Sequence, residues 1–131
     1  MDLRQSDTAI SQAADAKFEQ FDPDGEFQIR DLGVKEATGG AIEARILAAA
    51  KSCQGNIGQH RHDVDFQMFY VLKGSATFYF EGTGEVEVTP GSCVNMAAGV
   101  VHDMLDHSDD LEFIEVISPA QHGTEWIKPL E

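Results

Sequence analysis

Residues 55–74 read GNIGQHRHDVDFQMFYVLKG, and this stretch decides the fold. His60 and His62 are one residue apart, so on a β-strand both side chains project from the same face. A single metal ion could therefore take one nitrogen from each ring. A largely apolar run at 66–72 follows the histidines, and Gly74 ends that run with a turn. The spacing predicts two successive strands, the first of which carries a histidine pair.

Short strands separated by turns fill the chain on either side of this stretch. Gly, Pro and Asp residues punctuate alternating or apolar segments from residue 26 to residue 117, which predicts about nine or ten strands. No long helical pattern interrupts them, so an all-β sandwich or closed barrel is favoured over a parallel α/β sheet. In the strand at 42–46 we expect Ile42, Ala44 and Ile46 to face inward. We expect the run at 66–72 to be covered on both faces.

The N-terminal segment has a helical rather than a strand-like residue pattern. Residues 7–20 are rich in alanine, Asp7 can cap a helix, and Ile10 and Phe18 fall on roughly one helical face, so a short helix is predicted there. The turn Asp22-Pro-Asp-Gly25 ends it. We therefore divide the chain into a helical or extended arm at 1–25 and a β-barrel domain at 26–131.

The charge balance excludes several kinds of partner. The 131 residues include 9 basic and 23 acidic side chains, a formal net charge of −14, so we expect neither nucleic acid nor an anionic membrane to bind. No apolar run is long enough to span a bilayer, and the N-terminus lacks the features of a signal peptide, which predicts a cytoplasmic protein. Cys53 and Cys93 are then expected to be free thiols, with metal binding as the alternative.

Two spaced motifs carry a family resemblance. The first reads Gly55, then His60-Arg-His62, then Gln67 and Gly74; the second reads Gly91, Ala97-Ala-Gly99, His102 and Asp106. Their order and spacing resemble the cupin family, in particular small single-domain bacterial cupins. The resemblance implies an all-β, cupin-like double-stranded β-helix, or jelly-roll barrel, with a short N-terminal helix. Gln67 replaces the acidic ligand of the family motif, Ala97 its proline and Asp106 its asparagine, while Gly55 lies one residue closer to His60 than usual.

The expected metal site comprises His60, His62, Gln67 and His102. Imidazole suits one divalent transition metal, Fe, Zn, Ni or Mn, and three such ligands leave positions open for water or substrate. Gln67 offers a neutral oxygen where a carboxylate is usual, so the ion would keep nearly its full positive charge. Gln67 could instead hydrogen-bond a bound water or substrate, or be structural. Asp65 is a substitute carboxylate only if the strand bends, because its parity points it away from the histidines.

Strand parity assigns the other candidate residues. His107 differs from His102 by an odd number, so we expect it at the surface, and His122 is expected to be solvated. Met104 shares the parity of His102 and should line the pocket wall. Tyr79 belongs in the core, or could present its hydroxyl to a substrate. Trp126 either folds onto its own barrel or contributes to a homodimer, which we expect to form through an N-terminal strand or helix.

These features predict a metal-binding protein that acts on a small molecule. The leading hypothesis is a metal-dependent enzyme acting on a small oxygen-rich organic molecule, either dioxygenase-like or a Lewis-acid lyase, isomerase or hydrolase. A non-catalytic small-molecule-binding or sensor protein is the alternative, and a metal-free relic is the third possibility. No general base stands out beyond the ligand set.

Overall fold

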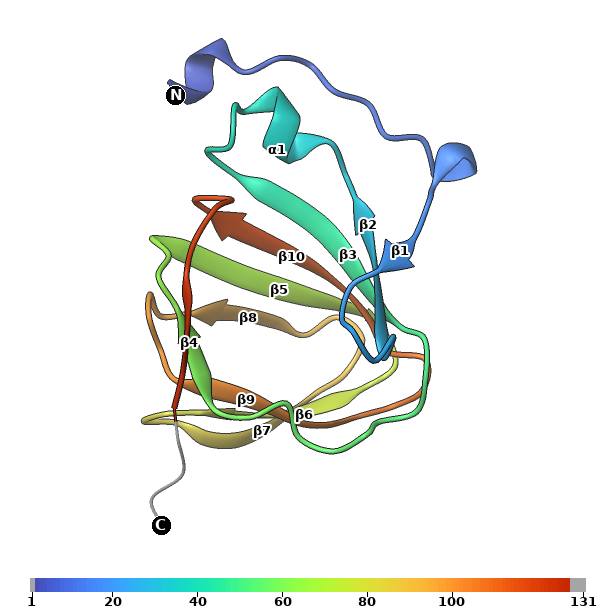
Figure 1. The fold of residues 1–131 in the computed structure, drawn as a ribbon, viewed down its shortest axis with the longest axis vertical. Helices are drawn as coiled ribbons and strands as arrows, with labels where there is room; N and C mark the ends of the chain where they lie inside the picture. The colour runs from blue at the N-terminus through green and yellow to red at the C-terminus, as the bar shows by residue number, and fades with distance from the viewer. Residues whose placement is uncertain (1, 128–131) are drawn as a thin grey trace.

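Two antiparallel sheets face each other in the computed structural model, which describes residues 2–127 (Figure 1). The first sheet has the strand order β1-β2-β3-β10-β5-β8, and the second has the order β11-β4-β9-β6-β7. The strands are β1 Glu19–Gln20, β2 Phe27–Asp31, β3 Glu43–Ala49, β4 His60–His62, β5 Phe66–Lys73, β6 Ala76–Phe80, β7 Gly84–Val88, β8 Cys93–Met96, β9 His102–His107, β10 Glu112–Ser118 and β11 Thr124–Trp126. The predicted jelly-roll barrel is confirmed.

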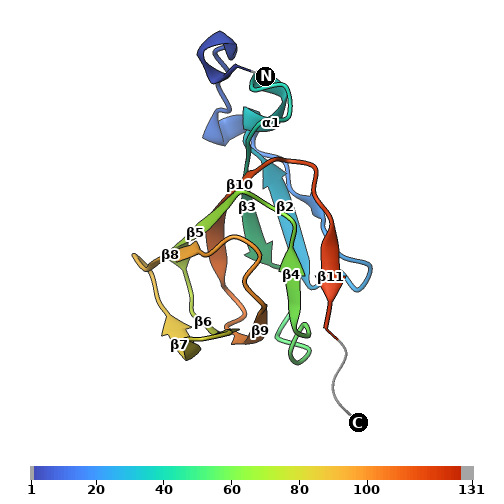
Figure 2. The same ribbon diagram turned by 90° about the vertical axis from the view of Figure 1, so that its left-hand side faces the viewer.

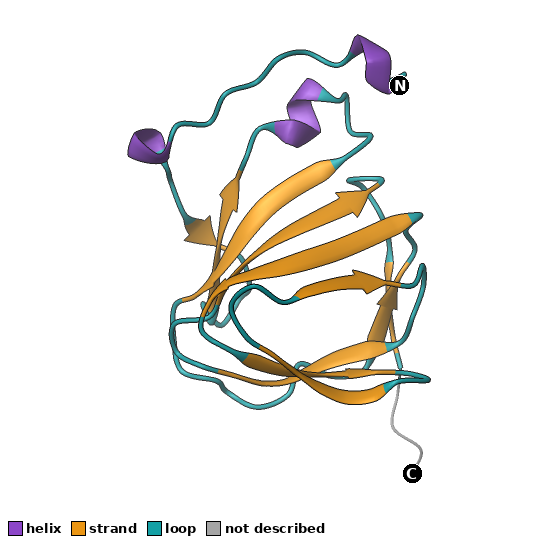
Figure 3. Cartoon of the chain, turned by 180° about the vertical axis from the view of Figure 1, so that it is seen from behind, coloured by secondary structure: helices purple, strands orange, loops and turns teal. Residues whose placement is uncertain are grey.

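The core lies between the two sheets. Side chains that alternate along β5, β6 and β10 meet there, and the aromatic rings of Phe69, Phe78 and Phe113 pack against one another with centroids 4.8 and 5.5 Å apart. Burial of such rings is the main favourable term in forming the sandwich. Seen from behind, the two layers of strands enclose the interior from above and below (Figure 3).

The N-terminal segment differs from its prediction. The helix expected over 7–20 is wrong: the chain forms only 3₁₀ turns at Leu3–Gln5 and Ala13–Asp15 and is otherwise extended, while the α-helix of the described chain spans Val34–Ala37, labelled α1. Ile10 is 77% exposed, so no apolar face packs against the barrel. A helix of that length is marginal in water without such packing, which explains the failure. β1 then pairs with β2 at the edge of the first sheet.

The burial of side chains on two strands, β3 and β5, differs from the prediction. On β3, Arg45 and Leu47 line the interior cavity, so the inward face predicted for Ile42, Ala44 and Ile46 is wrong. Ala44 is nevertheless buried, on the opposite face. The face of β3 that carries the charged Glu43 and Arg45 is the one that periodicity would place outside, and it is the inner one here. On β5, the outer face remains uncovered in the single chain, where Phe66, Tyr70 and Leu72 are 42%, 40% and 44% exposed.

A β-bulge re-aims the end of β9. Phe78 pairs with Met104, but the neighbouring Thr77 pairs with Asp106, so Leu105 is the extra residue. An extra residue reverses the alternation of side chains beyond it. His107 is therefore buried, at 6% exposure, and its predicted surface position is wrong.

Candidate metal centre

Three histidine rings converge at one side of the second sheet. β4 and β9 are neighbours, and His60 lies directly opposite His102 in their antiparallel pairing. His62 projects from the same face of β4, as its spacing predicted. One ligand nitrogen from each ring lies within 4.8 Å of those of the other two. The structure thus brings together residues 42 positions apart in the sequence (102 − 60), as expected from the motifs.

Hydrogen bonds fix which nitrogen of each ring faces the centre. Nδ1 of His60 lies 2.7 Å from the Gly58 carbonyl, and Nδ1 of His102 lies 3.0 Å from the Val100 carbonyl. A carbonyl only accepts, so each Nδ1 donates and each Nε2 keeps its lone pair. Nδ1 of His62 lies 2.9 Å from the Thr124 hydroxyl. This arrangement of outer hydrogen bonds is typical of metal-binding histidines.

The environment of two of these rings disfavours their protonated form. Burial, together with the neighbouring His60 and His102 rings, lowers the pKa of His62 from 6.5 to about 3. Burial also lowers the pKa of His102, against the opposing effect of its hydrogen bond to Val100. Metals bind the neutral form of imidazole. The donor set therefore fits a divalent transition metal in both geometry and protonation.

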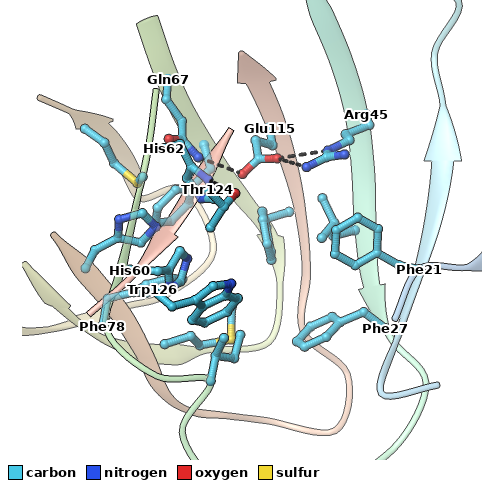
Figure 4. A pocket seen from close by; sticks show the side chains of 17 residues that line it. Phe21, Phe27, Arg45, His60, His62, Gln67, Phe78, Glu115, Thr124 and Trp126 are labelled. Carbon is cyan, nitrogen blue, oxygen red and sulfur yellow. Dashed lines mark hydrogen bonds and ion pairs between the residues drawn. The ribbon is translucent and has the colours of Figure 1, made fainter. Parts of the chain in front are cut away.

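A polar chain crosses the neighbouring sheet and ends at Gln67 (Figure 4). Nε2 of Gln67 donates to Glu115 at 3.3 Å, and the Arg45 guanidinium donates to the other oxygen of Glu115 from Nε at 2.9 Å. A second guanidinium nitrogen lies 2.8 Å from that same oxygen. Gln67 itself is only 4% exposed. With its nitrogen turned to Glu115, the amide oxygen is the atom left to face a metal or ligand.

Sequence reasoning missed Glu115 and Arg45. Each is a charged residue inside a largely apolar strand, one positive and one negative. The available signal was that such residues can pair when two strands lie side by side. The two residues lie directly opposite one another in the β3–β10 pairing. Glu115 thus places a carboxylate on the same cavity as the three histidines.

A cavity of about 350 Å³ lies beside the histidines. Its size is within the range of small-molecule sites. Met104 lines it as predicted, whereas Tyr79 is not among the lining residues. Most of the wall is apolar; its lining comprises Phe21, Phe27, Arg45, Leu47, Ile57, His60, His62, Gln67, Phe69, Phe78, Met96, His102, Met104, Phe113, Glu115, Thr124 and Trp126.

The last described strand covers one side of this cavity. β11 pairs with β4, and the two lie side by side in Figure 2. Trp126 packs on the ring of His60 with centroids 4.7 Å apart, so it folds onto its own barrel. It remains 57% exposed and stands at the entrance rather than in the core.

Other predicted candidates lie outside the three-histidine cluster. Asp65 is exposed, in agreement with its parity, and its backbone amide donates to Ser118. His122 is half-buried rather than fully solvated, and its ring approaches that of His62 at 5.3 Å. Asp103, which the sequence did not single out, is 2% exposed and accepts a hydrogen bond from the Gly58 amide at 2.8 Å. It therefore holds the loop that leads into β4.

Comparison with known proteins agrees with the motifs. The sequence model of the family described as "Cupin domain" matches residues 53–117. The oxalate-binding protein of Thermotoga maritima is 32% identical over 95 residues, which span 71% of this chain and 76% of that protein. The chain belongs to the cupin family. The structure of this cupin also resembles solved structures of other proteins.

Two of these structures illustrate the shared fold. The polyketide cyclase RemF from Streptomyces resistomycificus matches with a TM-score of 0.74 at 20% identity, covering 95% of this cupin and 88% of RemF. KdgF from Halomonas sp. matches with a TM-score of 0.69 at 17% identity, covering 86% and 96%. At these identities the likeness concerns the fold alone. In the described part of the cupin, no helix is long and apolar enough to cross a membrane.

Proposed function

We propose that this cupin is a metal-dependent enzyme acting on a small oxygen-bearing organic molecule. His60, His62 and His102 would hold one divalent ion, Fe, Zn, Ni or Mn, with the Gln67 oxygen as a further ligand. The observation that carries the proposal is the convergence of three imidazoles on one side of a cavity of about 350 Å³. A bound divalent ion supplies Lewis-acid polarisation of a coordinated oxygen.

The cavity wall narrows the class of ligand. Apolar side chains, among them phenylalanines and methionines, form most of the lining, and the polar groups are the histidines, Gln67, Thr124, Arg45 and Glu115. Such a pocket favours a molecule with an oxygen-bearing end and an apolar body, such as a diketone or a phenolic compound. A small dianion such as oxalate would leave the apolar wall without a partner. We therefore consider oxalate a weaker candidate ligand than the larger oxygenated molecules, although a relative is an oxalate-binding protein.

Glu115 is the proposed proton acceptor. Arg45 fixes one carboxylate oxygen, and the second oxygen faces Gln67 at the cavity wall. A carboxylate held in this way is oriented and needs no rearrangement to accept a proton from a bound molecule. This geometry supports the lyase or isomerase version of the activity over the dioxygenase version, because proton transfer needs a positioned base.

A non-catalytic binding or sensor role is the second candidate. The 32% identity to an oxalate-binding protein favours it, because that relative is described by what it binds. The same pocket would serve, with the metal as the docking point for the ligand and Glu115 as a polar contact. Turnover of a bound molecule separates the two candidates.

The outer face of β5 supports a homodimer. Phe66, Tyr70 and Leu72 expose apolar surface side by side on one strand, although we expected this run to be covered on both faces. A second copy of the chain would cover this outer face, so that β5 would be covered on both faces as expected. We propose this face, rather than the N-terminal arm, as the centre of the dimer interface.

Metal content tests the proposed site directly. The purified cupin should bind one divalent ion per chain, and His60→Ala and His102→Ala should each lose it. Arg61→Ala is a matched control, because Arg61 lies between the two histidines of β4 and instead pairs with Glu125 at the surface. Normal metal binding by either histidine variant would overturn the assignment.

Activity is tested on a panel of diketones, phenolics and hydroxy acids. Glu115→Gln should retain the metal and lose at least about a hundredfold in turnover, the usual contribution of a positioned base. Ligand binding without turnover by the metal-loaded wild type would support the sensor role. Full activity of Glu115→Gln would remove Glu115 from the proposal.

A further inference from the structure

A second group of potential metal ligands lies at the other end of β9. Glu26, Cys53 and His107 each offer one ligand atom, and these atoms lie within 4.8 Å of one another. Glu26 precedes β2, Cys53 is in the loop after β3, and His107 ends β9. His102 begins that strand, so five residue steps of about 3.3 Å separate the two groups by roughly 17 Å. In Figure 1, the start of β2 and the end of β3 lie at the side of the barrel away from β4.

Hydrogen bonds around this group orient its donor atoms. Nδ1 of His107 donates to the Ser108 carbonyl at 2.8 Å, which leaves Nε2 facing the cluster. Nε2 lies 2.7 Å from one oxygen of Glu26, while the other oxygen accepts the Gln54 backbone amide at 3.2 Å. The rings of His60 and His102 use the same Nδ1-to-carbonyl arrangement in the first site. Outer partners of this kind are the support that metal ligands require.

Burial and access also suit an ion. The His107 side chain is 1% exposed and that of Glu26 is 11% exposed, whereas Cys53 is half-buried. The thiol therefore stands on the solvent side of a buried imidazole–carboxylate pair, and an ion can enter past it. The Phe27 ring packs on His107 at 4.9 Å and also lines the main cavity, so the two sites lie on either side of this ring.

We propose that Glu26, Cys53 and His107 form a second metal site, which binds Zn²⁺ or another thiophilic divalent ion. A thiolate, an imidazole and a carboxylate are the ligand types that zinc prefers, and a water molecule would complete four-fold coordination. Tetrahedral ligands at zinc bond lengths lie about 3.3–3.8 Å apart, so the donors need to move by less than about 1 Å. The ion displaces the thiol proton and the proton shared by His107 and Glu26.

Cobalt(II) is the probe that separates this site from the first one. A bound thiolate gives a near-ultraviolet charge-transfer band, and the three-histidine site contains no cysteine. Titration of the wild-type protein with cobalt(II) should produce this band. The band should stop growing when one cobalt ion per chain is bound at the cysteine-containing site. The band should persist in His60→Ala, even if that variant loses the first metal. Absence of the band at excess cobalt would overturn the second site without affecting the first.

The two cysteines provide a matched pair of variants. Cys53→Ser should abolish the charge-transfer band, and Cys93→Ser should leave it unchanged, because Cys93 is exposed on β8. Loss of the band in Cys93→Ser alone would overturn the assignment. Circular dichroism confirms that each variant is folded.

Thiol protection gives a test that needs no substitution. Zn²⁺ should slow the alkylation of Cys53 by iodoacetamide at least about tenfold in the wild type, because the metal-bound sulfur is a poorer nucleophile. Cys93 should react at an unchanged rate in the same molecules, as peptide mass spectrometry would show. Equal rates for Cys53 with and without zinc would contradict the proposal, whatever the variants do.

Discussion

Gln67 determines the charge balance of the first site. Its nitrogen donates to the Glu115 carboxylate, and its side chain lines the same cavity as the three histidines. A glutamate at this position would place two carboxylates against each other unless a cation lay between them. The amide therefore satisfies Glu115 beside Arg45 in the metal-free protein without adding a second buried negative charge.

Gln67→Glu should make the cupin depend more strongly on its metal. We expect the metal-free variant to lose about 1–3 kcal/mol of unfolding free energy, because like charges then meet in a buried site. Metal retention should rise by at least about tenfold, or 1.4 kcal/mol. Urea denaturation in EDTA measures the first effect, and competition with a chelator measures the second.

Gln59→Glu is the control, since it adds the same charge at an exposed position just before β4. If both properties of Gln67→Glu match those of the control, Gln67 does not contact the metal.

Gly74 is required by two independent constraints at the turn after β5. Its φ is +73°, and a Cβ there would lie 2.8 Å from Cα of Leu111 and 2.4 Å from the Ser108 hydroxyl. The clash with backbone leaves no easy relief. The family motif placed a glycine here, and the structure supplies the reason.

Gly74→Ala should lower the unfolding free energy by about 2–4 kcal/mol, because steric strain adds to the cost of a left-handed backbone. Gly82→Ala isolates the backbone part: φ at Gly82 is +85°, but nothing lies within 4 Å of its added Cβ. The control should lose only about 1–2 kcal/mol. Equal losses in urea denaturation would show that the turn relaxes around the new methyl group.

At the level of elements, regular alternation predicted most of the site. His60 and His62 share one face of β4, His102 lies opposite His60 on β9, and Met104 shares the parity of His102. The rule failed beyond Leu105, where a bulge reversed the parity and buried His107. It also failed on β3, where the face that carries the charged Glu43 and Arg45 is the inner one. Sequence periodicity describes a single strand, whereas bulges and phase depend on its partners.

The packing of β4 against β9 predicts how the metal-free cupin responds to pH. Burial and the neighbouring imidazoles lower the pKa of His62 to about 3, against 6.5 for the ring in an unfolded chain. As the pH falls below about 6.5, the unfolded chain binds protons that the folded chain excludes. Stability is therefore full above this pH and decreases as the pH falls towards 3.

The expected slope is on the order of 1 kcal/mol per pH unit for this ring, after allowance for solvent screening. Urea denaturation in EDTA between about pH 7.5 and about pH 5 measures it. His62→Gln should have a shallower pH dependence. A slope identical to that of the wild type would show that other groups cause the acid sensitivity.

At the level of the whole molecule, composition and turn spacing were sufficient to predict a two-sheet barrel. The order of the strands was not predicted from pattern alone, because it depends on pairings such as β3 with β10, which are distant in the sequence. Local propensity predicts a helix in the N-terminal arm, whereas the arm forms only two 3₁₀ turns, because helix formation also depends on packing. An exposed arm lacks the tertiary contacts that stabilise most protein helices.

The proposed dimer predicts a change of mass on substitution of its central face. Leu72→Glu places a charge amid the exposed apolar residues of β5 and should convert a dimer into a monomer in light scattering coupled to size-exclusion chromatography. Thr83→Glu, in the exposed turn between β6 and β7, should leave the mass unchanged. A wild-type protein that is monomeric at micromolar concentration would contradict the proposal.

The pairing of β3 with β10 has a consequence for folding kinetics. Arg45 and Glu115 are 70 residues apart and directly opposite each other, so a loop of that length must close before β3 and β10 can pair. Loops of that length carry a large entropy cost, and topologies rich in such distant pairs refold in about milliseconds to seconds. During that interval the long, apolar β5 has no neighbour on its β10 side. Aggregation is therefore expected mainly before β10 pairs with β5. Refolding at high protein concentration or raised temperature should give a lower yield of soluble protein for this reason.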